Sequence, residues 1–127
     1  MRRLLRRLFG GGEPEPKPAG PARNEHSVIV HLRLSDNEFG TTEERDSIHG
    51  LTSELERRID KAAVGEFDGD EFGGGECTLF MYGPDAERLF AAIEEPLRAS
   101  AHARRGIVIK RYGPIEDSSA REVRIEL

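Results

Sequence analysis

The sequence predicts an α+β domain of the ferredoxin-like class, in which a split βαβ arrangement forms an antiparallel sheet with two helices on one face. Two observations support this prediction. Five segments have the apolar and turn-residue patterns of strands, and two longer segments repeat apolar residues at helical spacing. Their order is β-α-β-β-α-β, followed by one C-terminal strand. The expected strand order in the sheet is 4-1-3-2, with the fifth strand beside the fourth.

The first half of this pattern covers residues 27–82. Residues 27–34 alternate cleanly and predict a strand, and Thr41 with Glu44 has the spacing of a capping box that opens a helix reaching Ala62. The strands expected at residues 64–72 and 76–82 flank three consecutive glycines. Such a run indicates a hairpin, and Gly69 indicates a bulge in its first strand.

The second half begins with Pro84 and Asp85, which are typical of the first turn of a helix. Pro96 is expected to bend or end this helix, because proline removes one helical hydrogen bond. Residues 107–112 and 122–127 then predict the last two strands, joined by a hairpin loop.

Charge divides the 127-residue chain into two parts. Residues 1–23 hold six basic and two acidic residues, whereas residues 24–127 hold 13 basic and 22 acidic ones. We therefore expect a disordered basic tail with a Gly- and Pro-rich linker at 1–23, and one folded domain at 24–127. A domain with this excess of acidic residues repels polyanions, so nucleic acid is not an expected partner.

The tail begins with a segment that has the spacing of an amphipathic helix. Apolar and basic side chains lie on opposite sides of it: Leu4, Leu5, Leu8 and Phe9 against Arg2, Arg3, Arg6 and Arg7. Its apolar runs are too short for a secretory signal or a membrane span. The pattern favours docking on an anionic lipid surface, to which each arginine contributes about 1 kcal/mol. A protein groove and an idle tail are the alternatives.

One face of the predicted sheet carries no helix, and its residues are the first candidate site. A mixed aromatic and charged set is expected there: His31, Arg33, Phe80, Tyr82 and Tyr112. Ile109 and Arg111 are the alternates if the fourth strand presents its other side. A contiguous patch of this kind favours a platform for a partner or ligand, or a homodimer in which two such faces pack together.

The acidic hairpin is the second candidate site. Asp68, Asp70 and Glu71 are candidate ligands for a hard cation, although the spacing does not match an EF-hand loop. The alternatives are a solvated acidic rim that blunts edge pairing and a surface that attracts a basic partner.

The sequence offers no established catalytic motif and implies no cofactor. Cys77 lies in the middle of an apolar strand, which favours an inert core thiol over a nucleophile, and His31 is the only candidate acid–base group. We therefore expect a cytoplasmic, non-enzymatic interaction or regulatory module held near a membrane by its tail, with an unidentified protein partner. The alternative is a small dimeric enzyme or ligand sensor with its pocket on the open sheet face.

Overall fold

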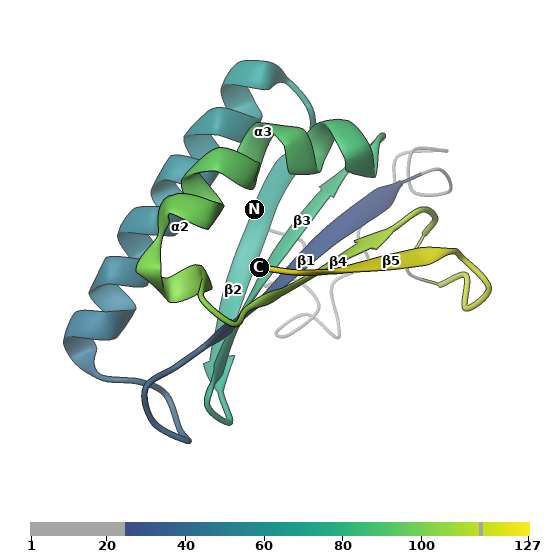
Figure 1. Ribbon diagram of the computed structural model, residues 1–127. Helices are drawn as coiled ribbons and strands as arrows, with labels where there is room; N and C mark the ends of the chain where they lie inside the picture. Colours follow the sequence, from purple (N-terminus) through teal and green to yellow (C-terminus); the bar gives the residue numbers. More distant parts are fainter. Residues whose placement is uncertain (1–24, 115) are drawn as a thin grey trace, which may run out of the picture.

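The computed structural model describes residues 25–114 and 116–127, and the predicted tail lies outside them. Five strands form one antiparallel sheet in the order β2-β3-β1-β4-β5, and helices α2 and α3 cover one face of it (Figure 1). The elements in chain order are β1 (His26–Arg33), α2 (Thr42–Ala62), β2 (Glu66–Gly73), β3 (Glu76–Gly83), α3 (Ala86–Ala99), the 3-10 helix η2 (Ala101–Ala103), β4 (Ile107–Arg111) and β5 (Glu122–Glu126). The predicted ferredoxin-like arrangement is confirmed, with the fifth strand beside the fourth.

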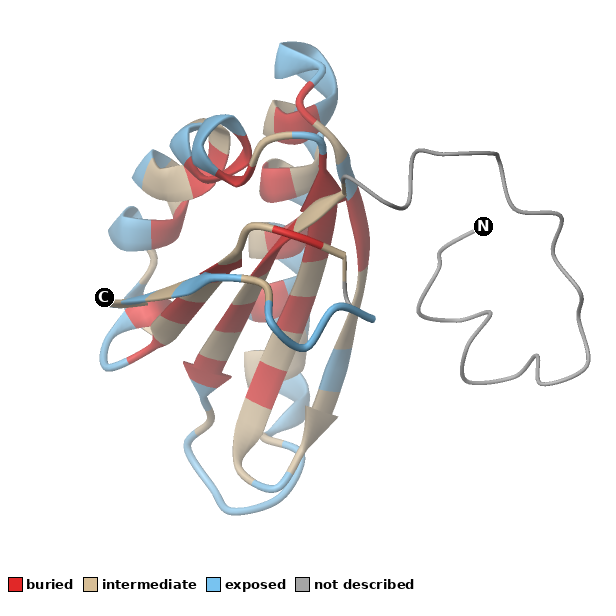
Figure 2. Cartoon of the chain, turned by 90° about the vertical axis from the view of Figure 1, so that its right-hand side faces the viewer, coloured by how far each residue is buried: buried red, intermediate tan, exposed pale blue. Residues whose placement is uncertain are grey.

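Strand β1 lies at the centre of the sheet, because it pairs with β3 on one side and with β4 on the other. Val28, Val30 and Leu32 lie on its helix-covered side and have no exposed surface. Buried residues are concentrated where the helices meet the sheet (Figure 2). Each buried aliphatic side chain contributes roughly 1.5–3 kcal/mol relative to an exposed one, so this layer supplies most of the driving force for folding.

Two glycines form the turn of the β2–β3 hairpin. Gly74 and Gly75 have φ values of +61° and +82°, as a two-residue type I′ turn requires. The register of the two strands shifts between Phe67 and Gly69, so Asp68 is the extra residue of a bulge. The predicted hairpin is confirmed, and its bulge lies next to the glycine that indicated it.

Helix α2 begins at the predicted capping box. The Glu44 N–H donates to the Thr41 hydroxyl at 3.0 Å, and the Glu44 carboxylate accepts from the Thr41 N–H at 3.4 Å. The helix ends at Ala62, and the capping residue Ala63 has a left-handed conformation with φ +55° and ψ +45°. This conformation lets the Val64 N–H donate to the Ile59 carbonyl at 3.3 Å, which closes the helix end.

Helix α3 begins where its Asp85 cap accepts hydrogen bonds from two N–H groups of the first turn. The Ala86 N–H donates to Nδ1 of His26 at 3.0 Å, which ties the start of α3 to β1. Pro96 lies inside the helix, which continues to Ala99. Pro96 therefore does not end the helix, because packing of the following turn outweighs the one missing hydrogen bond.

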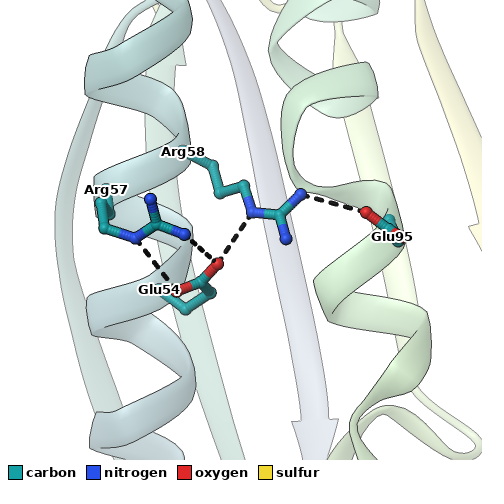
Figure 3. Close-up of polar contacts among 4 residues, drawn as sticks. All are labelled: Glu54, Arg57, Arg58 and Glu95. Carbon is teal, nitrogen blue, oxygen red and sulfur yellow. Dashed lines mark hydrogen bonds and ion pairs between the residues drawn. The ribbon is translucent and has the colours of Figure 1, made fainter.

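An ion-pair network joins the outer surfaces of the two helices (Figure 3). The Glu54 carboxylate accepts from Arg57 at 2.6 Å and from Arg58 at 2.8 Å, and Arg58 also reaches Glu95 on α3 at 3.1 Å. Hydrogen bonds from Arg57 and then Arg58 lower the pKa of Glu54 from 4.5 to about 2.

Substituting Ala63 by Gly should stabilise the domain by about 1 kcal/mol, because a left-handed residue with a Cβ carries roughly that cost. The measurement is urea unfolding at constant m-value. The matched control is Ala62→Gly one residue earlier, which should destabilise by about 0.5–1 kcal/mol because Ala62 is helical. A loss of stability in the Ala63 variant would contradict this description of the helix end.

Glu54→Gln should lower the melting temperature at pH 7, and the difference from the parent chain should close as the pH falls from about 4.5 to about 2. The sign follows from the lowered pKa of Glu54, since its ionised form stabilises the fold above 4.5 and is protonated as the pH approaches 2. Added salt should shrink the difference, because the pairs are exposed. The control is Asp46→Asn, since Asp46 has no ion pair within the described ranges. A pH-independent difference would contradict the account.

Candidate functional site

The helix-free face of the sheet is defined by the alternation of each strand. Cys77, Leu79 and Met81 of β3 are buried on the helix side, so the residues between them belong to the other side. We call this second side the open face. The β1 residues opposite them in register show the same division, and so do those of β4, where Val108 is buried on the helix side.

An apolar row crosses the middle of the open face. The register places its residues directly beside one another, from β2 to β5: Gly69, Phe80, Ile29, Ile109 and Arg124. Phe80, Ile29 and Ile109 are half-buried. The row is thus a strip of three large apolar side chains, with a glycine at one end and an arginine at the other.

A polar group lies beside this strip around His31. Its Nδ1 lies 3.4 Å from the Thr78 hydroxyl and 3.5 Å from the Glu76 carboxylate. Arg33 lies opposite Glu76 in register and is exposed, so these residues form one end of the open face as predicted. Ile107 is the β4 neighbour of His31 and continues the apolar surface.

His31 and Cys77 lie on opposite sides of the sheet, so they do not form a nucleophile–base pair. Cys77 has no exposed surface, and this burial, together with the charge of Asp70, raises the pKa of its thiol to about 12. A thiol of that pKa holds almost no thiolate at neutral pH. The structure therefore gives Cys77 the inert core role that the sequence favoured.

Tyr82 has the alternation of the open face but is only 3% exposed, and its β1 neighbour Ser27 is 1% exposed. The prediction that Tyr82 offers a contact surface is therefore corrected. The alternation of a strand gives the side on which a residue lies but does not show what covers it.

Tyr112 is also corrected, because it lies on the helix side. It packs against the core, and its hydroxyl hydrogen-bonds Glu87 of α3. Lys110 of β4 points the same way and pairs with Glu87 at 2.9 Å. The Tyr112 hydroxyl and then the Lys110 ammonium lower the pKa of Glu87. The alternates Ile109 and Arg111 occupy the open face instead, since Val108 takes the core position.

Phe39 is a residue that the sequence interpretation missed. It is 58% exposed, and its ring lies 3.8 Å from the position a Cβ would take on Gly73, at the hairpin end of β2. Its loop is held firmly, because Asp36 accepts from two N–H groups of the loop and Arg45 donates to the carbonyls of Phe39 and Gly40. The sequence signal that could have identified Phe39 as a surface contact is an aromatic residue in an otherwise polar turn.

The three carboxylates of the proposed cation site do not share one side of β2. Asp68 is buried in the bulge, Asp70 lies on the helix side 3.6 Å from His49, and Glu71 lies on the open face opposite Thr78. Within residues 25–114 and 116–127, no group of three or more His, Cys, Asp or Glu side chains could hold a metal ion. The geometry therefore gives no support to cation binding at this hairpin.

Comparison with known proteins gives no match: no family model, curated protein or solved structure is significantly similar to this chain. No helix in the described part of the chain is long and apolar enough to cross a bilayer. The function of the open face is therefore inferred from the residues and contacts described above.

Two aromatic substitutions should distinguish the surface from the core. Tyr82→Ala should lower the free energy of unfolding by about 3–4 kcal/mol, as expected for a buried aromatic ring, and Phe80→Ala by only about 1 kcal/mol. Urea unfolding of both variants measures the difference. Equal losses would mean that Phe80 belongs to the core, and this would remove it from the open face.

Proposed function

We propose that this chain is a non-enzymatic interaction module whose partner binds the open face of the sheet. The apolar row Phe80–Ile29–Ile109 carries this proposal, because a strip of large apolar side chains that neither α2 nor α3 covers is typical of a contact surface. The exposed Phe39 at the hairpin end supplies a second aromatic contact on a rigid loop.

Charge favours a basic protein as the partner. Residues 24–127 hold 22 acidic and 13 basic residues, so a second copy of the chain would approach against net repulsion. Exposed carboxylates, including Glu71 and Glu126, lie at the two edges of the open face. A partner with an apolar centre and a positively charged rim complements this pattern.

Photo-crosslinking from the open face tests this proposal. With p-benzoyl-phenylalanine in place of Phe80, we expect a crosslink to a basic protein in the cells that produce the chain. With the purified partner, the variant Phe80→Ala/Ile109→Ala should bind at least tenfold more weakly, since two central contacts are worth about 1.4 kcal/mol or more together.

Two controls make the crosslinking result decisive. The same photo-reactive residue at exposed Ala91 on α3 should not capture the partner, and Leu51→Ala on α2, a half-buried apolar position of the helix layer, should leave affinity unchanged. A crosslink only to a second copy, together with a dimer in sedimentation velocity, would overturn the proposal. That result would favour the dimeric enzyme or ligand sensor, with His31 inside the dimer.

The second part of the proposal concerns residues 1–9, which are outside the described ranges. Their basic and apolar residues have the spacing of an amphipathic helix, which supports a weak anchor on an anionic membrane surface. Such an anchor would hold a cytoplasmic domain near its partner through the Pro-rich linker. Four arginines are enough for reversible attachment but not for stable anchoring.

Co-sedimentation of the full chain with vesicles should require anionic lipid and low salt. Replacing the four arginines, Arg2, Arg3, Arg6 and Arg7, by Gln should reduce vesicle binding by tenfold or more, because each contributes about 1 kcal/mol near such a surface. The control Arg88→Gln/Arg124→Gln removes positive charge from the domain and should leave binding unchanged. Equal binding to neutral vesicles would contradict the anchor.

A further inference from the structure

One basic segment stands out in this acidic domain. Residues 96–115 contain no acidic residue but five basic ones. Lys110 and Arg111 are each bonded to a carboxylate of a neighbouring element. The other three line a single cleft: Arg98, Arg104 and Arg105.

The cleft lies where α3 ends, beside η2 and the residue that follows β5, and has a volume of about 480 Å³. Small-molecule sites commonly have roughly 300–1,000 Å³. Apart from Ser100, the rest of its lining is apolar: Ala99, Ala101, Ala103 and Leu127. It therefore combines guanidinium groups with small apolar side chains.

Two of the three guanidiniums have no carboxylate partner in the part of the chain that the structure describes. Arg98 pairs with Glu94 at 2.9 Å, whereas Arg104 and Arg105 form no ion pair within the described ranges. A guanidinium presents its N–H donors in a planar fork that matches two oxygens of a phosphate or carboxylate. The two guanidiniums of Arg104 and Arg105 together provide a charge of about +2. This charge matches a phosphate monoester dianion better than a single carboxylate.

The C-terminal end of helix α3 places partial negative charge near the cleft. The carbonyl end of α3 is equivalent to about half a negative charge. The two guanidiniums thus remain available to an external anion.

The backbone that carries these arginines is held in place. The Ser100 hydroxyl accepts from the His102 N–H at 3.2 Å, and the His102 ring lies 2.8 Å from the Ser47 hydroxyl of α2. Arg105 has a φ of +64°, a left-handed conformation that costs about 1 kcal/mol in a residue with a Cβ. A backbone fixed in this way reduces the ordering cost of binding.

We propose that this cleft binds the phosphoryl group of a small organic phosphate. Arg104 and Arg105 bind the phosphoryl oxygens, and the alanine side chains and Leu127 contact the apolar part of the molecule. This site is separate from the open face and does not depend on the function proposed for that face.

Amide NMR titrations of the full chain at constant ionic strength test the site, with inorganic phosphate and phenyl phosphate as probes. We expect saturable shifts centred on residues 99–106 and Leu127, with phenyl phosphate at least threefold tighter because of the apolar lining. Arg104→Ala/Arg105→Ala should weaken binding at least tenfold. The control Lys61→Ala/Arg88→Ala removes the same charge from two exposed positions outside the cleft and should leave binding unchanged.

Three results would overturn the proposal: shifts that do not saturate, shifts spread over the surface, or equal weakening by the control pair, which would indicate only general attraction of anions. Benzoate binding as tightly as phenyl phosphate would overturn the phosphoryl assignment in favour of a carboxylate. If the double variant does not fold, Arg104→Ala alone decides, since Arg104 has an ordinary φ of −58°.

Discussion

The handedness of two chain crossovers determines which face of the sheet the helices cover. Strands β1 and β2 are parallel to each other and are joined through α2, and β3 and β4 are likewise parallel and joined through α3. Strands β3 and β4 point in the opposite direction to β1 and β2. The connection from β3 to β4 also crosses the sheet towards the β5 edge, whereas the connection from β1 to β2 crosses it towards the β2 edge. Both crossovers follow the usual right-handed rule. Because strand direction and direction of travel across the sheet are both reversed in the second crossover, both helices lie on the same face (Figure 1). The other face carries no helix of residues 25–114 or 116–127.

The sequence was sufficient for most of this architecture because its local patterns agree with one another. The capping box at Thr41, the glycine run at the hairpin and the clean alternation of residues 27–34 each define an element without reference to the rest of the chain. Their order then leaves few topologies, and the observed strand order is the one that the sequence predicts. Pro96 was expected to bend or end α3, and tertiary packing carries the helix past it to Ala99.

The candidate site was less predictable because it depends on contacts between elements. Residues 107–112 are compatible with either side of the sheet, and only the core position of Val108 and the Glu87–Lys110 pair decide that Tyr112 lies under α3. Tyr82 was assigned to the correct side of its strand, but periodicity carries no information on burial. The cleft lined by Arg98, Arg104 and Arg105 lies between the end of α3 and Leu127. These segments are far apart in the sequence, so only the folded structure brings them together.

The central claim is that the open face is covered by a partner when the protein is at work. Carbene footprinting of intact cells and of the purified protein tests this most directly, with labelling read at Phe80, Ile29 and Ile109. The account predicts that these residues are labelled in the purified chain and protected in cells, while exposed Ala91 on α3 is labelled equally in both. Equal labelling of the three residues in both samples would contradict the claim.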